Sequence, residues 1–247
     1  MFLAWLEALQ ARHLADLRIG EVTRALRALS SAYVERRGAV RGALDTTGKR
    51  AAFALFYAPL HFLITQLIVR SVSPPALSPR LILDVGCGTG AAGAAWAMET
   101  GAAAVAGLDR HPWAVAEASW TYQQLSLAGR ARQGDAARLP PPAPGTSVVA
   151  GYVLNELAQG DREALELRLF DAAGRGTPVL IIEPIARRVA PWWDGVAARA
   201  QSLGGRADEW RFPVDLPPFL RLLDKAAGLD HRELTARSIY CPGSAFL

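Results

Sequence analysis

Cysteine and histidine are scarce in this chain of 247 residues. Two cysteines, Cys87 and Cys241, supply neither a disulfide framework nor enough thiolates for a cysteine-only zinc or iron–sulfur site. The four histidines show no metal-ligand spacing, so we expect no catalytic metal. The chain also lacks a basic leader and reaches Glu7 before any long apolar segment, which is not typical of a secretory signal peptide. A reducing cytoplasm is therefore the simplest expected compartment.

Net charge is low, and it is confined to one end of the chain. The first 50 residues hold nine Lys/Arg against five Asp/Glu, whereas residues 51–247 hold eighteen of each. A basic cluster around a glycine-containing loop would suit the phosphates of an RNA. Its members are Arg36, Arg37, Arg41, Lys49 and Arg50. The alternative is an ordinary solvated helix face, because a net charge of +4 is modest for a nucleic-acid-binding protein.

One long apolar segment, residues 51–69, contains nineteen residues without a formal charge. The length permits a membrane span, but Pro59, His61, Thr65 and Gln66 interrupt it, so we expect a buried helix or helix pair that packs on a sheet, with an interfacial helix as the alternative. Residues 1–78 are predicted to form a separate helical extension that ends in a Pro- and Ser-rich linker. Residues 79–247 are predicted to form the catalytic domain.

The most informative segment is Leu-Ile-Leu-Asp-Val-Gly-Cys-Gly-Thr-Gly at residues 81–90. Its apolar start predicts a buried parallel strand, and its alternating glycines predict a tight turn in which no Cβ blocks a ligand. A helix should begin near Gly90 and direct its free N–H groups at that ligand. The pattern predicts an α/β fold.

Two classes of ligand compete for this turn. Gly86, Gly88 and Ala91 also satisfy the G-x-G-x-x-G/A spacing of a dinucleotide site. The carboxylate of Asp84, however, would repel a pyrophosphate, whereas it suits a cation such as the sulfonium and amino groups of S-adenosylmethionine. The segment resembles the first motif of class I S-adenosylmethionine-dependent methyltransferases. That resemblance implies a Rossmann-like, mostly parallel sheet of seven strands, with S-adenosyl-L-methionine as cofactor.

Polar residues follow the ends of the later predicted strands, where open α/β sheets bind ligands. Asp109 lies 23 residues beyond Gly86, close to the interval for a carboxylate on ribose hydroxyls. The resemblance places the adenine amino group near Asp135. The predicted cofactor-binding residues are Asp84, Gly86, Cys87, Gly88, Gly90, Asp109, Arg110, Asp135, Ala136 and Asn155. Structural alternatives stay open, because Asp135 and Asn155 could cap a turn or helix and Glu183 could be an ordinary strand end.

Methyl transfer mainly requires placement of the acceptor in line with the methyl carbon. The predicted catalytic residues are Asn155, which could orient an amino group, and Glu156 and Glu183, which could accept a proton. Tyr152, Trp192 and Trp193 could stack on a planar acceptor or belong to the core, and Arg187 and Arg188 could contact an anionic acceptor or face solvent.

The C-terminal part is predicted to complete the sheet. We expect residues 206–212 to cover the acceptor pocket, residues 217–228 to form a helix, and residues 229–240 to form a closing hairpin or strand pair. The stretch from His231 to Arg237 is too polar for a deeply buried strand.

Further segments extend the resemblance. Phe56-Tyr57-Ala58-Pro59, residues 153–157 (Val-Leu-Asn-Glu-Leu) and residues 181–184 (Ile-Ile-Glu-Pro) are similar to the mitoribosomal small-subunit methyltransferase-like family and its bacterial relatives. The resemblance implies an RNA or ribosomal acceptor, bound in part by the basic N-terminal helices. This chain has too few cysteines for the iron–sulfur cluster of the mitochondrial members. A small-molecule methyltransferase with a helical lid, a non-catalytic ribosome-assembly protein and a nicotinamide oxidoreductase are the alternatives. No membrane partner is expected, and the oligomeric state is undetermined.

Overall fold

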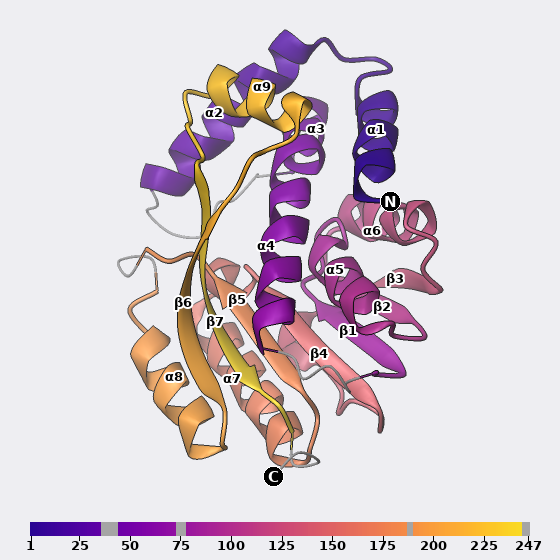
Figure 1. Ribbon diagram of the computed structural model, residues 1–247. Helices are drawn as coiled ribbons and strands as arrows, with labels where there is room; N and C mark the ends of the chain where they lie inside the picture. Colours follow the sequence, from indigo (N-terminus) through magenta and orange to yellow (C-terminus); the bar gives the residue numbers. More distant parts are fainter. Residues whose placement is uncertain (36–43, 73–77, 187–189, 244–247) are drawn as a thin grey trace.

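A seven-stranded sheet forms the centre of the computed structural model, which describes residues 1–35, 44–72, 78–186 and 190–243 (Figure 1). The strands are β1 (Leu81–Val85), β2 (Val105–Asp109), β3 (Gly129–Gln133), β4 (Thr146–Gly151), β5 (Val179–Glu183), β6 (Arg206–Pro213) and β7 (Glu233–Cys241). Their order is β3-β2-β1-β4-β5-β7-β6, and β7 alone runs in the direction opposite to the other strands. The predicted fold class, a mostly parallel Rossmann-like sheet with an N-terminal helical extension, is confirmed.

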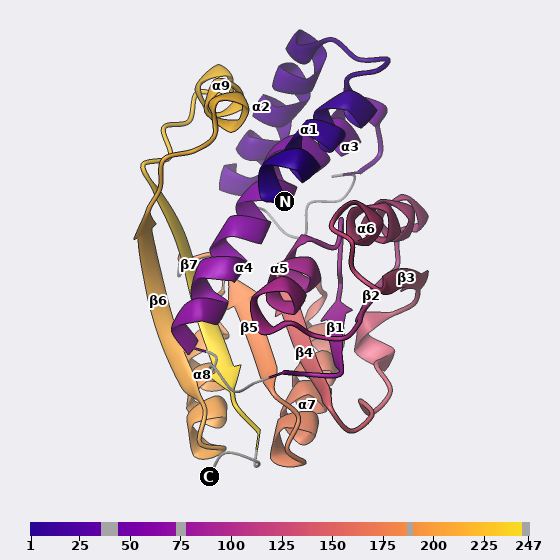
Figure 2. The ribbon, with the colours of Figure 1, turned by 45° about the vertical axis from the view of Figure 1, so that its right-hand side comes forward.

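Helices cover both faces of the sheet. They are α1 (Phe2–His13), α2 (Ile19–Glu35), α3 (Thr47–Ala52), the π-helix η1 (Phe53–Tyr57), α4 (Ala58–Val72), α5 (Ala91–Thr100), α6 (Pro112–Gln124), the short 3-10 turns η2 (Ala136–Arg138) and η3 (Leu154–Glu156), α7 (Gln159–Gly174), α8 (Trp193–Ser202) and α9 (Pro218–Ala226). One layer contains α4, α5 and α6, and the other contains α7 and α8 (Figure 2). Helices α1, α2, α3 and α9 gather at one end of the molecule (Figure 1).

Cover on both faces explains the composition of the central strands. Every residue of β5 is buried, so its branched run Val-Leu-Ile-Ile faces apolar side chains in both layers. Helix α5 is almost entirely Ala and Gly up to Trp96, and these small residues let α4 pack closely over it. The helix starts directly after the glycine turn, as the sequence predicts.

The uncharged segment at 51–69 lies inside one long helix, Thr47–Val72, in which η1 separates α3 from α4. By length and composition this helix could cross a membrane, and it is the candidate found among the described residues. However, 67% of its most apolar 18-residue stretch is buried inside the protein. The buried helix predicted for this segment is confirmed. The side chain of Thr46 caps its start by accepting a hydrogen bond from the Lys49 N–H at 3.2 Å.

The N-terminal helices share one hydrophobic core with the sheet. Trp5 and Leu26 belong to the same buried cluster as Ile82 of β1 and Leu180 of β5. Buried Glu117 of α6 also contacts two residues of α1. It accepts a hydrogen bond from Arg12 Nε at 3.2 Å, and its other oxygen lies 2.7 Å from His13 Nε2. The helical extension predicted at residues 1–78 is present, but within the described residues it does not have a separate core.

Two expectations for the C-terminal part are wrong. Residues 206–212 belong to β6, which pairs along its length with β7 at the edge of the sheet and forms no cover. Residues 229–240 contain a single strand, β7, and the hairpin partner is β6, with α9 between them. The helix predicted at 217–228 is confirmed as α9.

The stretch from His231 to Arg237 is only partly buried, as its polar residues predict, since Arg232 is exposed and Glu233 and Thr235 are half-buried. Burial of β7 becomes complete from Ala236 onward, and there Arg237 departs from the prediction. Arg237 is 1% exposed. Its guanidinium lies 5.1 Å from the centre of the Trp193 ring and donates to the Ile185 carbonyl, and Arg237 stands opposite Glu183 in the β5–β7 register. These partners offset the cost of burying the charge, which polarity alone does not reveal.

Candidate functional site

The turn between β1 and α5 depends on glycine at each of its three alternate positions. Gly86, Gly88 and Gly90 have φ angles of +65°, +51° and +80°. A Cβ at Gly86 would lie 2.2 Å from Val153 Cγ2, and one at Gly90 would lie 2.7 Å from Tyr122 Cε1. Any larger residue would push the turn away from the β4 loop or from α6. The glycines therefore let the main chain lie at the switch point between β1 and β4, where such sheets bind ligands.

Asp84 fixes the start of this turn by joining β1 to α5. It is 1% exposed, and its Oδ2 accepts a hydrogen bond from the Gly93 N–H of α5 at 2.8 Å. Burial raises the pKa of Asp84 to about 8. The carboxyl group thus has a structural role between β1 and α5, and its contact with a cationic cofactor stays a prediction. Cys87 is 7% exposed, and burial raises the pKa of its thiol well above the usual value.

Asp109 joins the end of β2 to the glycine turn. Its Oδ2 accepts a hydrogen bond from the Gly88 N–H at 2.9 Å, and its Oδ1 accepts one from the His111 N–H at 2.8 Å. The side chain is half-buried, and the neighbouring Arg110 is exposed. The structure therefore brings together the carboxylate and the turn that the sequence predicts to hold one ligand.

Asp135 follows β3 and caps η2, which is the structural role that the sequence leaves open for this residue. Its Oδ1 accepts a hydrogen bond from the Ala137 N–H at 3.0 Å. The side chain remains 45% exposed, and Ala136 beside it is buried. A cap and a ligand contact are compatible because a carboxylate can accept several hydrogen bonds.

The order of the strands aligns the predicted residues along one edge of the sheet. From β3 through β2, β1 and β4 to β5, the strand ends present Asp135, Asp109, Gly86, Asn155 and Glu183 in that spatial order. Residues separated by about a hundred positions in the sequence therefore line one continuous edge.

Glu183 and Asn155 are linked through the main chain. Glu183 is fully buried, and its Oε1 accepts hydrogen bonds from the N–H groups of Leu154 at 2.9 Å and Asn155 at 3.3 Å. This arrangement gives Glu183 a structural role in holding η3. Glu156 is half-buried, which makes it the more accessible of the two predicted proton acceptors.

The side-chain amide of Asn155 has an unusual environment. Both Asn155 Oδ1 and Nδ2 are buried, and within the described ranges neither atom has a hydrogen-bond partner. Such a group is costly unless a ligand or water satisfies it. The amide is therefore an observation in favour of a ligand at the end of β4.

Four aromatic rings lie beside this edge, and of these only Tyr152 is predicted from the sequence to stack on an acceptor. Phe53, Tyr57 and His61 come from η1 and α4, and Tyr152 follows β4. The His61 and Tyr152 rings are stacked, with centres 4.1 Å apart and planes at 13°. The spacing of four residues between Phe53, Tyr57 and His61 places them on one helix face, a pattern that could have indicated the cluster.

The other proposed stacking residues are placed differently. Trp193 is 6% exposed and packs in the core layer of α8. Trp192 is half-buried, with the Arg162 guanidinium 5.3 Å from its ring centre. Arg187 and Arg188 lie outside the described residues.

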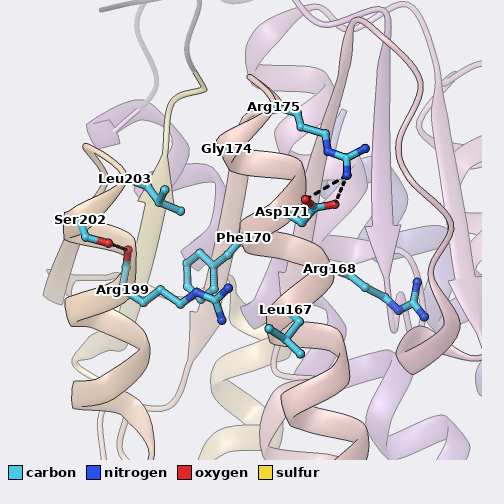
Figure 3. A pocket seen from close by; sticks show the side chains of 9 residues that line it. All are labelled: Leu167, Arg168, Phe170, Asp171, Gly174, Arg175, Arg199, Ser202 and Leu203. Carbon is cyan, nitrogen blue, oxygen red and sulfur yellow. Dashed lines mark hydrogen bonds and ion pairs between the residues drawn. The ribbon is translucent and has the colours of Figure 1, made fainter.

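Two hollows of the described surface lie away from the predicted site. A groove of about 650 Å³ between α7 and α8 is lined by residues such as Phe170, Arg175 and Arg199 (Figure 3). A second cavity of about 560 Å³ lies beside the Pro-rich loop that precedes β4. None of the predicted site residues lines either hollow.

Comparison with known proteins identifies the class. Residues 82–171, from β1 into α7, match the model of a methyltransferase domain. The chain thus carries an S-adenosylmethionine-dependent methyltransferase domain with the class I fold. No curated protein sequence matches the chain.

Solved structures share the fold at low sequence identity. Mitomycin 7-O-methyltransferase MmcR has a TM-score of 0.54 and 16% identity, over 97% of this chain and 72% of that chain. The methyltransferase domain of bacterial CtHen1 has a TM-score of 0.50 and 12% identity, over 75% of this chain and 98% of that chain. The putative RNA methyltransferase PH1948 from Pyrococcus horikoshii has a TM-score of 0.50 and 13% identity, over 88% and 98%.

The cofactor of the domain is S-adenosylmethionine, and the residues of this chain fit it. The turn at Gly86–Gly90 leaves main-chain atoms accessible, Asp109 offers a carboxylate, and Asn155 offers an unsatisfied amide. When bound, the cofactor supplies an electrophilic methyl group on a sulfonium. The contacts of individual residues with its ribose, adenine and amino acid groups stay predictions.

Proposed function

We propose that the domain methylates RNA, either free or within a ribosomal particle. The observation that carries the proposal is a strip of exposed arginines along the edge strand β3, next to the predicted adenine end of the cofactor site. Arg130 and Arg132 lie on β3, Arg110 follows β2, and Arg138 belongs to η2. All four side chains are exposed. A phosphate backbone is the polyanion that such a strip would bind.

The two arginines of β3 share one face of the strand. The side chain of Ala131 between them packs against the core beside Tyr122 of α6, and its N–H donates to Ser119 Oγ at 2.9 Å. Since side chains alternate along a strand, Arg130 and Arg132 lie on the face opposite α6. Neither has an ion-pair partner within the described ranges. Their charge therefore remains for an external anion.

The basic N-terminal cluster would extend this surface. Only Lys49 and Arg50 of it are described, since Arg36, Arg37 and Arg41 lie outside the described residues. Arg50 Nε donates to the Leu44 carbonyl at 2.7 Å, so that side chain is partly engaged within the protein. The resemblance to mitoribosomal methyltransferase-like proteins and the similarity of fold to the putative RNA methyltransferase PH1948 are consistent with the proposal, and we propose a cytoplasmic location for the reaction.

The residues of the edge have distinct tasks in this reaction. The glycine turn and Asp109 bind and orient the cofactor, and Asn155 orients the acceptor or the cofactor through its amide. Glu183 fixes the loop that carries Asn155. Glu156 accepts the proton when the acceptor atom carries one. The long helix 47–72 excludes water from the turn through Phe53, which a Cβ at Gly88 would approach to 3.7 Å.

The test follows radioactive methyl groups from labelled S-adenosylmethionine into ribosomal RNA, ribosomal particles and a low-mass extract, separated by size. We expect the label in RNA. The double variant Arg130→Gln/Arg132→Gln should raise the KM for RNA about tenfold and weaken its salt dependence, with unchanged affinity for the cofactor. Arg206→Gln/Arg211→Gln on β6, the opposite edge strand, removes the same charge and should leave the KM for RNA unchanged. Equal effects of both double variants would contradict the proposal.

A small-molecule methyltransferase is the second candidate, because the helical extension packs against the cofactor turn as a lid would. Phe53 borders Gly88, and MmcR, an O-methyltransferase by name, shares the fold over 97% of this chain. Label that appears only in the low-mass fraction would select this candidate. Cofactor binding without label in either fraction would favour the assembly protein.

A further inference from the structure

We infer that the four-ring cluster of Phe53, Tyr57, His61 and Tyr152 is the acceptor-binding wall and that the methylated atom belongs to a planar ring stacked there. The inference rests on the proposed function for the source of that ring, since the ring is a nucleobase if the acceptor is RNA. It therefore selects base methylation over methylation of a ribose hydroxyl. A free aromatic compound would offer the same chemistry.

The first support is the exposure pattern along the long helix. Phe53, Tyr57 and His61 are half-buried, whereas Leu55 and Phe56 between them are fully buried. Their spacing of four residues aligns the half-buried rings on one helix face. The ring centres of Phe53 lie 5.8 Å from Tyr57 and 6.1 Å from His61. The helix thus places a compact set of partly exposed rings on one face, while the intervening Leu55 and Phe56 fill the core.

The second support is the position of the cluster beside the cofactor turn. Phe53 is the side chain that a Cβ at Gly88 would meet, at 3.7 Å from Cε1. Gly88 in turn donates its N–H to Asp109, the predicted ribose ligand. The cluster therefore borders the cofactor turn directly, as an acceptor wall must if the transferred methyl carbon is to reach the acceptor atom.

The third support is backbone strain at Tyr152. Its φ angle is +60°, a strained conformation that bulky side chains rarely adopt. The strain is maintained by a hydrogen bond from the Tyr152 N–H to the Ile182 carbonyl at 2.7 Å and by the stack on His61. The π-helix at Phe53–Tyr57 is a second irregularity in the same cluster, and such turns are frequent at functional sites.

The fourth support is the combination of flat rings with an unsatisfied amide. Asn155 lies three residues after Tyr152, and both polar atoms of its side chain are buried without a partner in the part of the chain that the structure describes. An amide offers one acceptor and two donors, which matches the edge of a heteroaromatic ring. His61 is neutral near pH 7, since burial lowers its pKa to about 4, so no charge opposes stacking.

A ring nitrogen or a ring hydroxyl can accept the methyl group. The lone pair of the acceptor atom forms the new bond to the methyl carbon as the carbon–sulfur bond breaks, and sulfur keeps the electron pair of that bond. A proton on the acceptor atom leaves to Glu156 or to water. The wall holds the acceptor atom in line and takes no part in bond making.

The first experiment digests the labelled RNA to nucleosides and locates the methyl group. We expect it on a base. A label on the ribose 2′-oxygen would overturn the inference and leave the proposed function intact. A label on a free aromatic compound, with none in RNA, would keep the wall and remove the RNA proposal. A label on an acceptor without a planar ring, in the RNA or in the low-mass fraction, would overturn the assignment of the four rings as the acceptor-binding wall.

The second experiment removes single rings. Phe53→Leu and Tyr57→Leu should each raise the KM for the acceptor about tenfold, because a stacked base contributes roughly one such factor. Calorimetry should show cofactor affinity within about twofold of wild type. Tyr57→Phe keeps the ring and should retain the wild-type KM. Phe2→Leu is the matched control, since Phe2 packs against Phe62 of the same helix with ring centres 5.3 Å apart.

A binding measurement covers the case in which no acceptor is labelled. We would compare a short single-stranded oligoribonucleotide with an abasic chain of the same length, in the presence of the demethylated cofactor product. We expect the base-containing chain to bind at least tenfold more tightly and Phe53→Leu to remove that difference. Equal binding of the two chains by the wild type, or the same loss in Phe2→Leu, would overturn the inference.

Discussion

The cofactor side and the acceptor side of the site are held in place by different kinds of contact. On the cofactor side, main-chain groups of the turn at Gly86–Gly90 meet the carboxylate of Asp109, which follows closely in the sequence. On the acceptor side, side chains from the helix at residues 53–61 meet Tyr152, about ninety positions away. The first side is built from backbone geometry and the second from packing. They should therefore respond to different substitutions.

The largest expected effect is on the backbone geometry. Gly86→Ala places a Cβ 2.2 Å from Val153 Cγ2 at a positive φ, so we expect it to lower the free energy of unfolding by about 3 kcal/mol or more. Gly88→Ala has the same kind of φ but a nearest contact of 3.7 Å, which leaves a strain of about 1 kcal/mol. Urea unfolding of the two variants checks the difference. Equal stabilities would mean that packing at Val153 does not constrain the turn.

The next effect separates positioning from proton transfer at the acceptor side. Glu183→Ala leaves the N–H groups of Leu154 and Asn155 without their acceptor and should destabilise the protein by about 3 kcal/mol. Glu183→Gln retains an oxygen for both groups, so we expect most of the stability and turnover to remain. Thermal unfolding and the pH profile of kcat check both variants. A stable Glu183→Gln protein without turnover would instead make Glu183 the proton acceptor.

A smaller effect tests the cofactor side alone. Asp109→Asn replaces the carboxylate predicted to bind the ribose hydroxyls and should weaken S-adenosylmethionine about tenfold to a hundredfold, since hydrogen bonds to a charged group contribute about 1.5 to 3 kcal/mol. Calorimetry measures the affinity, and Asp171→Asn, in an exposed ion pair with Arg175, is the matched control. The KM for the acceptor should change little. Unchanged cofactor affinity would remove the ribose assignment.

The same division explains what the sequence could predict. The glycine spacing and Asp109 act over short distances along the chain, so the turn, the parallel sheet and the shared edge of Asp109 and Asp135 were predictable. The contact between His61 and Tyr152 depends on how a long helix packs over the sheet, which periodicity does not specify. The burial of Arg237 was missed because its partners, the Ile185 carbonyl and the Trp193 ring, come from elements distant in the sequence.

The structural role of Asp84 yields an effect that is small for each pH unit, a dependence of stability on pH. Burial raises its pKa from 3.8 to about 8, so within that window the folded protein keeps a proton that the unfolded chain has released. Stability should therefore fall with rising pH, by about 1.4 kcal/mol per pH unit for this one group. Asp84→Asn keeps an oxygen for the Gly93 N–H and removes the titration. The two proteins, unfolded in urea at pH 5, 6 and 7, should diverge by that slope.

The same measurement in the presence of cofactor tests whether the carboxyl group of Asp84 lies near the sulfonium. A sulfonium near the carboxylate would favour its ionised form and lower its pKa, so saturating S-adenosylmethionine should flatten the slope. The homocysteine product, whose sulfur is uncharged, should flatten it less. If both ligands changed the slope equally, Asp84 would hold the turn against α5 without an interaction with the sulfonium. The cofactor side would then recognise its ligand through Asp109 and main-chain groups, and charge selection would belong to other residues.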